Sequence, residues 1–386
     1  MTAPGWYAGL MTGTVLDGEI DIAFLKTDGE GIVEFGPAAM SPYNDDVREM
    51  IADAVATARH WNFDGPEPPI FAEAERALTG AQAEAVVNIA ASHDFPIEDI
   101  SAVGFHGQTV LHRPPADSHR GRTRQLGDGA LMAEMIGRPV IFDFRSADVA
   151  AGGHGAPLCP CYHAALLKRA GADETVAVLN LGGVGNITWQ GKDGRLLGFD
   201  TGPANAPIDD WVRRHNAGTM DAGGRIAASG EVDHARLTEI MNKSYFSELP
   251  PKSLDRNDFS LSLADGLSLP DGAALLTALA AAGVARAVDI LPTKVRRLIV
   301  CGGGRHNPAL MNAITAATGL AVEPADSLGW RSDTVEAECF AYLAARHLAG
   351  LPVSHPQTTG VPTPMTVGRL AMPNASSRLD GSGDSA

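Results

Sequence analysis

Two glycine-rich segments, far apart in the chain, most constrain what this sequence can fold into. The first runs from Gly9 to Gly18 and leads into the strand-like residues 20–25, and the second covers residues 180–188 between two β-rich runs. Because glycine has no Cβ, successive N–H groups of such loops can point at phosphate oxygens. Neither loop has P-loop or dinucleotide-binding spacing. Each alone also suits an ordinary hairpin, but the pair suggests a nucleotide held between two related domains.

Length and charge limit the possible classes of protein. At 386 residues the chain is long for a single core, so we expect two domains. Apolar residues make up 45% and charged residues 20%, the balance of a soluble globular protein. The net charge of −16, without a basic stripe, argues against a nucleic-acid partner. An anionic substrate must then be met by local Arg or Lys side chains, backbone amides or a metal ion.

The N-terminal residues indicate where the protein works. The first glycine-rich loop begins at Gly9, and no basic segment followed by an apolar one precedes it, so no secretory signal is visible. We therefore expect a cytoplasmic protein. The most apolar long run, residues 273–290, contains Thr277, Arg286 and Asp289, which suits a packed helix better than a membrane span.

Strand and helix patterns alternate along the chain and predict an α/β protein. Expected helices cover residues 45–58, 71–92, 206–215, 233–242, 273–290 and 334–348, with Asp128 capping another, and expected strands cover 103–106, 139–143, 297–301 and the hairpin run 175–200. That hairpin run repeats the opening theme, which suggests a duplicated topology. We expect an N-terminal domain of residues 1–140 completed by a C-terminal helix within 340–373, a second domain of 141–339, and a disordered tail of 374–386.

Two polar segments follow expected strands of the second domain. In Gly198-Phe-Asp-Thr-Gly-Pro-Ala-Asn205, Asp200 ends a strand and Asn205 is available to cap the next helix. Asp200 then faces a cleft, or it forms an Asx-turn with the Gly202 amide. The glycines at 302–304 follow the apolar strand 297–301, and open α/β sheets bind ligands at such strand ends.

The first domain carries further candidates. In Phe142-Asp-Phe-Arg145-Ser-Ala-Asp148, a guanidinium and two carboxylates follow a strand. The planar Arg145 fork suits a substrate carboxylate, although a surface ion pair is the alternative. His106 is equally compatible with a packed histidine and a substrate contact. Glu336 begins the last helix, where its alternative role is to complement the helix dipole.

Taken together, these motifs are similar to those of a known family. The segments GLMTGTVLDG, FHGQTVLHRP, QLGDGALMA, FDFRSADVAAGGHGAPL, LNLGGVGNIT, GFDTGPAN, CGGGRHNPALM and EAECFAYLA, in this order, resemble the anhydro-N-acetylmuramic acid kinase family from Gly9 to about Pro373. The resemblance implies a two-domain actin-like ATPase (hexokinase-like) α/β fold with a central nucleotide cleft. Val15 replaces the usual Ser of the first phosphate loop, and Ala204 replaces the usual Gly of the second motif.

The resemblance also implies an activity and its residues. Such kinases use ATP and Mg²⁺ to open a 1,6-anhydro sugar with water and phosphorylate O6, and a homodimer is expected. Asp200 would be the base, and Asp17 would hold Mg²⁺ through water. Residues expected at ATP are Gly9, Thr12, Gly13, Thr14, Val15, Leu16, Asp17, Gly18, Gly182, Gly183, Asn186, Gly302, Gly303, Gly304 and Asn307, and those expected at the sugar are His106, Arg145, Asp148, Gly202, Asn205 and Glu336. A levoglucosan-type kinase and a non-catalytic nucleotide-dependent module remain alternatives.

Overall fold

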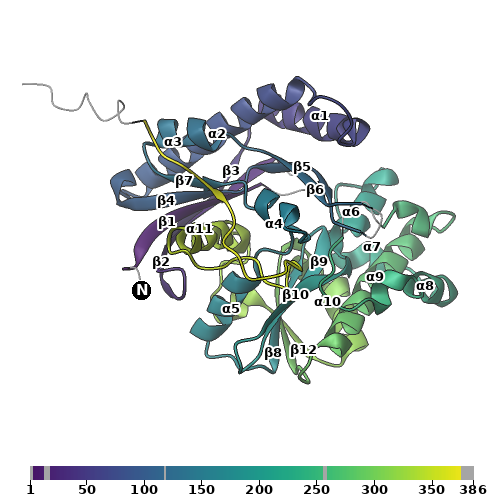
Figure 1. Ribbon diagram of the computed structural model, residues 1–386. Helices are drawn as coiled ribbons and strands as arrows, with labels where there is room; N and C mark the ends of the chain where they lie inside the picture. Colours follow the sequence, from purple (N-terminus) through teal and green to yellow (C-terminus); the bar gives the residue numbers. More distant parts are fainter. Residues whose placement is uncertain (1–2, 13–17, 117–118, 255–258, 375–386) are drawn as a thin grey trace, which may run out of the picture. The chain divides into compact units, whose positions relative to one another are not determined.

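The computed structural model describes residues 3–12, 18–116, 119–254 and 259–374. The described residues form two compact units (Figure 1). Unit 1 is drawn from Met1–Gly155, Thr334–His355 and Val361–Ala386, and unit 2 from Ala156–Asp333 and Pro356–Gly360. The predicted glycines and strand ends of residues 180–304 thus all belong to unit 2.

Each unit is built on one main β-sheet. Unit 1 has the strand order β13-β7-β4-β1-β2-β3, from β1 (Gly5–Met11), β2 (Glu19–Thr27), β3 (Ile32–Pro42), β4 (Ile100–Phe105), β7 (Val140–Phe142) and β13 (Arg369–Ala371). A separate hairpin joins β5 (Gln108–Arg113) and β6 (Arg122–Leu126). Unit 2 has the order β10-β9-β8-β11-β12, from β8 (Val176–Leu181), β9 (Val184–Gln190), β10 (Leu196–Pro203), β11 (Arg297–Cys301) and β12 (Ala321–Pro324).

The two sheets share one topology, which confirms the predicted duplication. In unit 1, β1, β2 and β3 are antiparallel neighbours, while β4 is parallel to β1 and β7 is parallel to β4. In unit 2, β8, β9 and β10 pair in the same antiparallel way, while β11 is parallel to β8 and β12 is parallel to β11. The turn between the first two strands is glycine-rich in each unit.

Each helix belongs to one of the two units. Unit 1 contains α1 (Asp45–Trp61), α2 (Ile70–Ser92), α3 (Gly129–Ile136), α4 (Ser146–Ala150) and α11 (Val335–Leu348), and unit 2 contains α5 (Pro160–Arg169), α6 (Asn205–Arg214), α7 (Arg225–Ala228), α8 (His234–Met241), α9 (Leu269–Ile290) and α10 (Pro308–Thr318). Within unit 1, α1, α2 and α3 lie over one face of the sheet and α11 covers the other (Figure 1).

Capping explains where two of these helices begin. The Asp128 side chain accepts a hydrogen bond from the Leu131 N–H and caps α3, as predicted. The prediction for Asn205 is wrong: Ala204 holds the cap position of α6, and Asn205 is already helical. Its side-chain amide donates to the Asp209 carboxylate at 2.7 Å. Asn205 therefore stabilises the first turn from within.

The boundary between the units differs from our expectation at residue 140. Strand β7 pairs with β4 and β13 of unit 1, and the division falls after Gly155. Helix α11 joins unit 1 because it packs directly on β1 and β4. A Cβ on Gly9 would lie 1.9 Å from the Ala337 carbonyl oxygen, and one on Gly104 would lie 2.0 Å from that of Phe340. Gly9 is therefore required for packing.

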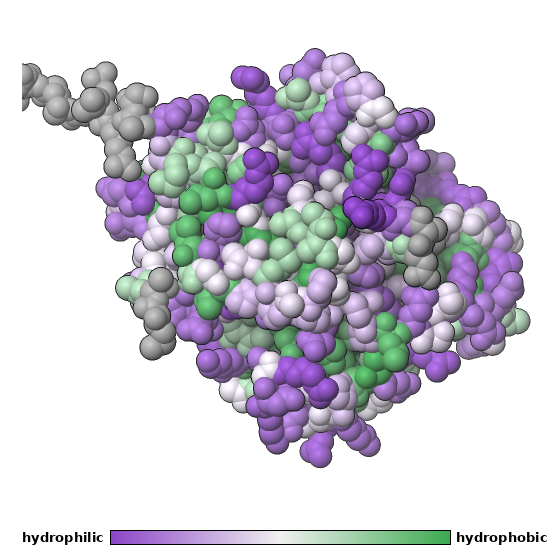
Figure 2. Space-filling model, in the orientation of Figure 1, coloured by the Kyte–Doolittle hydropathy of each residue, from purple (hydrophilic) through white to green (hydrophobic). Residues whose placement is uncertain are grey.

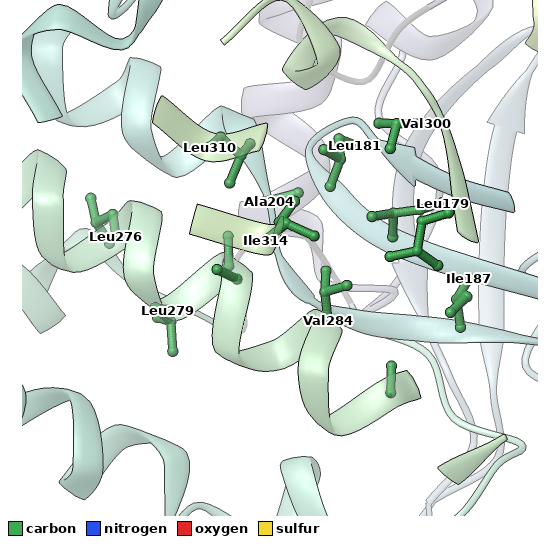
Figure 3. Packing of buried hydrophobic residues seen from close by; sticks show 14 of the residues in the cluster. Leu179, Leu181, Ile187, Ala204, Leu276, Leu279, Val284, Val300, Leu310 and Ile314 are labelled. Carbon is green, nitrogen blue, oxygen red and sulfur yellow. The ribbon is translucent and has the colours of Figure 1, made fainter. Parts of the chain in front are cut away.

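Helix α9 forms the centre of the unit 2 core. Val284 of this helix points toward Ile187 of the sheet, and Leu276 and Leu279 belong to the same buried cluster (Figure 3). The helix is long and apolar enough to cross a membrane, but 61% of its most apolar window is buried. It is thus a core helix, as we expected. Hydrophilic residues cover most of the visible surface (Figure 2).

A buried histidine in unit 2 gives an acid-sensitive contribution to stability. His163 of α5 is 1% exposed, its Nδ1 lies 2.8 Å from the Thr188 hydroxyl, and burial lowers its pKa to about 4. Between pH 6.5 and pH 4, His163 is protonated in the unfolded chain but stays neutral in the folded chain. We expect the free energy of unfolding to lose about 3 kcal/mol from this group as the pH falls from 6.5 to 4.

Urea unfolding of the wild type and of His163→Gln between pH 4 and pH 8 measures this contribution. The variant should show a shallower loss of stability than the wild type below pH 6.5. Equal slopes for the two proteins would contradict the assignment.

Candidate functional site

The glycine-rich loops of unit 2 lie against one another. The Ala204 N–H donates to the Gly183 carbonyl at 3.2 Å, and the Asn205 N–H donates to that of Gly182 at 3.1 Å. A Cβ on Gly304 would lie 2.7 Å from the Cβ of Leu181, so the 302–304 loop packs directly on the end of β8. The structure thus brings three sequence-predicted segments together around the start of α6.

These loops stand at the carboxyl ends of two parallel strands. Cys301 of β11 pairs with Asn180 of β8, and each strand then ends in glycines. A Cβ on Gly303 would meet no atom within 4 Å, so space remains beside the backbone. Open α/β sheets bind ligands at this position. The arrangement fits a phosphate-bearing ligand held by backbone N–H groups.

Asn307 adds an unused donor beside the same loops. Its Oδ1 accepts from the Leu310 N–H at 3.1 Å and caps α10. Its Nδ2 is buried and has no hydrogen-bond partner among the described residues. A buried donor of this kind calls for a ligand or a water. Asn307 therefore fits its place among the residues expected at ATP.

Asn186 lies in strand β9 and not in the preceding turn. It is directly opposite Asn180 of β8 and directly opposite Asp200 of β10. Directly opposed residues of antiparallel strands carry their side chains on the same face. The structure therefore places Asn186 beside the predicted base.

Asp200 is held by a loop that the sequence did not reveal as functional. The side chain is 6% exposed, and its Oδ2 accepts from the Leu254 N–H at 2.8 Å. Its backbone N–H donates to the Lys252 carbonyl at 3.2 Å, and its carbonyl accepts from the Tyr245 hydroxyl at 2.6 Å. The Asx-turn alternative invoked the Gly202 amide, whereas this carboxylate bond comes from a distant segment.

Three residues of unit 1 that we predicted to contact the sugar lie close together near Gly155. Nη1 of Arg145 donates to the Gly155 carbonyl at 2.7 Å, and Nη2 lies 3.3 Å from Nε2 of His106. Nδ1 of His106 lies 2.7 Å from the Gly107 carbonyl, so we assign the proton to Nδ1 and the lone pair to Nε2. Burial, and then Arg145, lower the pKa of His106 to about 3, so the ring is neutral at physiological pH.

Asp148 is the third member of this group. It is fully buried, and its Oδ1 accepts from the Gly155 N–H at 2.7 Å. Its Oδ2 is buried and has no hydrogen-bond partner among the described residues. A surface ion pair therefore does not describe this carboxylate, and a ligand hydroxyl would satisfy the second oxygen.

A polar pocket of about 380 Å³ opens beside His106 within unit 1. It lies at the carboxyl ends of β4 and β7, and its lining includes His106, Gln125, Asp128, Phe142, Asp143 and Arg369. The pocket combines an aromatic face with charged and amide groups, which suits a small polar molecule. His106 is thus both packed and adjacent to a cavity.

The remaining residues that we predicted to contact ATP or the sugar are not all described by the structure, and they differ in their surroundings. Gly13, Thr14, Val15, Leu16 and Asp17 lie outside the described residues. The Thr12 side chain is 2% exposed and its Oγ1 bonds to the Tyr43 hydroxyl and the Gln82 amide, at 2.8 and 2.6 Å, which argues against a phosphate contact by this hydroxyl. Gly18 has a φ of 87°, a left-handed conformation that favours glycine. Glu336 lies in the first turn of α11 and remains a predicted sugar contact.

A protein family model and several known proteins match this chain along most of its length. The family model for anhydro-N-acetylmuramic acid kinase matches residues 5–373. The chain is 55% identical to the anhydro-N-acetylmuramic acid kinase of Rhizobium rhizogenes over 95% of this chain and 99% of that protein, and 55% identical to that of Brucella anthropi with the same coverage. The enzyme of that name from Mesorhizobium japonicum is 53% identical over 95% and 99%.

Solved structures are more distant. Component A of the (R)-2-hydroxyglutaryl-CoA dehydratase from Acidaminococcus fermentans has a TM-score of 0.45 and 13% identity, over 88% of this chain and 99% of that chain. The family match and the curated relatives, in contrast, span nearly the whole sequence. The chain belongs to the anhydro-N-acetylmuramic acid kinase family.

Proposed function

We propose that this protein is an ATP-dependent kinase that opens 1,6-anhydro-N-acetylmuramic acid with water and phosphorylates O6, giving N-acetylmuramic acid 6-phosphate. Family membership supports the kinase class and the sugar. The observation that carries the proposal is the placement of Asp200, a firmly held carboxylate opposite Asn186 and beside the glycine loops of unit 2.

The bonds that change define what the residues must do. Water attacks C1 of the bridged sugar, the C1–O6 bond breaks, O6 forms a bond to the γ-phosphorus, and the bond from that phosphorus to ADP breaks. Asp200 takes one proton from the water, and the other stays on the new anomeric hydroxyl. The glycine loops at 182–183 and 302–304 hold the nucleotide, and Asn307 contacts the nucleoside. Positioning and charge neutralisation supply most of the remaining acceleration.

We propose that the reaction also requires Mg²⁺, which would be bound to ATP. In proteins this ion keeps several waters and uses few carboxylates, so it would arrive on the phosphate oxygens and offset their charge. Among the described residues there is no group of three His, Cys, Asp or Glu side chains that could hold a metal ion. Asp17, our candidate for a water-mediated contact, lies outside them. We further propose that the enzyme is cytoplasmic and that it forms a homodimer. Light scattering during gel filtration measures its molar mass and so tests the homodimer.

Arg145 gives a prediction for substrate choice. The lactyl carboxylate of the proposed sugar is absent from levoglucosan, and Arg145 carries a guanidinium beside His106. We expect Arg145→Met to raise KM for the anhydromuramic acid by about 10-fold or more, because a charge-assisted hydrogen bond contributes roughly 1.5–3 kcal/mol. Any turnover of levoglucosan should change much less. Steady-state kinetics with both sugars measures the ratio, and equal changes would remove Arg145 from the carboxylate contact.

An ADP-release assay with and without the sugar tests the proposed function itself. The kinase proposal expects ADP release to depend on anhydro-N-acetylmuramic acid. Stimulation of less than about twofold would favour a nucleotide-dependent binding module, because uniform ligand binding does not accelerate the chemical step. Preference for levoglucosan would instead identify an unsubstituted anhydrosugar as the substrate.

A further inference from the structure

A buried lysine that the proposed reaction does not use lies next to Asp200. Lys252 is 4% exposed, and its Nζ donates to the Tyr245 carbonyl at 2.9 Å. The same ammonium lies 4.6 Å from the centroid of the Tyr245 ring and 5.7 Å from that of Phe199, the residue before Asp200 in β10. Lysine is almost never fully buried unless it is paired, so this position requires an explanation.

Lys252 belongs to a segment, residues 244–254, that we call the Asp200 strap. The strap contacts Asp200 at three atoms: the backbone N–H, the carbonyl oxygen and Oδ2. Their partners are the Lys252 carbonyl, the Tyr245 hydroxyl and the Leu254 N–H, at 3.2, 2.6 and 2.8 Å. These bonds fix both the main chain and one oxygen of the carboxylate.

Lys252 also links two parts of the strap, because it bonds to Tyr245 as well as to Asp200. Its carbonyl accepts from Asp200, its ammonium donates to Tyr245, and the Tyr245 hydroxyl donates back to Asp200, which closes a ring of three residues. Charge-assisted hydrogen bonds and cation–π contacts are stronger where water is excluded. Removing the ammonium would therefore loosen Tyr245 and, with it, Asp200.

The charge of Lys252 acts on Asp200 as well. Burial lowers the pKa of Lys252, whereas Glu248 and Asp200 raise it. The attraction is mutual, because a cation nearby favours the ionised form of a carboxylate. The titratable groups facing one another here are Asp200, Lys252, Glu248 and the Tyr245 phenol.

We propose that Lys252 is a positioning residue for the reaction: through the Asp200 strap it holds the carboxylate of Asp200 in its proton-accepting orientation. This inference rests on the proposed function, in which Asp200 is the base. A purely structural lysine would support the fold of the strap without affecting the protonation of Asp200.

The test compares Lys252→Met and Lys252→Arg with the control Lys243→Met. Lys243 is the residue immediately before the strap, and it is exposed. Its Nζ lies 5.4 Å from the centroid of the Phe259 ring. We expect Lys252→Met to lower kcat about 10-fold or more and to move the acid limb of the kcat/KM profile to higher pH, with Kd for ATP within about twofold of the wild type. Lys252→Arg should restore the position of the limb, and Lys243→Met should change neither quantity.

The outcomes separate this inference from the proposed function. A wild-type limb and turnover in Lys252→Met, while Asp200→Asn is inactive, overturn the role of Lys252 alone. Near-normal activity of Asp200→Asn overturns the proposed base. If Lys252→Met fails to fold, Tyr245→Phe replaces it, since this variant removes one hydroxyl. A lower kcat at an unchanged Tm supports the strap, and an unchanged kcat overturns it.

Discussion

Asp200→Asn is expected to bind ATP normally and to lose at least about a hundredfold in turnover, the range that general-base catalysis provides. Asparagine keeps the size of aspartate, and its amide oxygen can still accept from the Leu254 N–H. It cannot take a proton from water. The loss should therefore appear in kcat and not in nucleotide affinity. Steady-state turnover of the anhydro sugar and ATP titration by calorimetry measure the two quantities separately.

Asp210→Asn is the matched control for this variant. Asp210 is also an aspartate of unit 2, in α6, where it pairs with Arg213 and both side chains are partly exposed. Exposed ion pairs contribute little to stability, so this control should retain full activity and nearly full stability. Near-normal turnover of Asp200→Asn would remove Asp200 from the role of base, and a comparable loss in the control would show that the assay reports folding.

Gly104→Ala is expected to lower the free energy of unfolding by about 3 kcal/mol or more, at the upper end of overpacking effects. The added Cβ would lie 2.0 Å from the Phe340 carbonyl oxygen and 2.5 Å from its carbon, so the backbone of α11 must move. Because that contact is with backbone and not with a flexible side chain, relaxation is costly. Urea unfolding of the purified variant measures the loss.

Gly80→Ala provides the opposite expectation from the same chemical change. Gly80 lies within α2, and a Cβ there would meet nothing within 4 Å. Replacing a glycine in a helix interior by alanine should raise stability by about 0.5–1 kcal/mol. Similar stabilities for the two alanine variants would mean that α11 does not pack tightly on β4.

Local sequence signals predicted most of the regular elements. Strand β11 begins and ends where the apolar run 297–301 does, and the helices α1, α2, α8 and α11 lie within a few residues of their expected bounds. Alternation, periodicity and the Asp128 cap act over a few residues, so they can be read from neighbours in the chain. The Asn205 cap failed because Ala204 takes that position and the amide bonds to Asp209.

The candidate site was predictable only in part, for a related reason. Asp200 was found because a carboxylate at the end of a strand is a local feature. Its partners Tyr245 and Leu254 are 45 and 54 residues away along the chain, and no pattern in the loop links them to Asp200. The buried charge of Lys252 was likewise invisible, since exposure depends on tertiary packing. The domain boundary shifted to Gly155 because the pairing of β7 is also non-local.

The fate of the oxygen from water tests the central claim most directly. In ¹⁸O-labelled water, the purified enzyme with ATP and 1,6-anhydro-N-acetylmuramic acid should yield a sugar phosphate that carries the label at the anomeric hydroxyl and not in the phosphate. Mass spectrometry of the product and of its fragments locates the label. Label in inorganic phosphate, with the sugar unchanged, would contradict the account, because water would then attack ATP instead of C1.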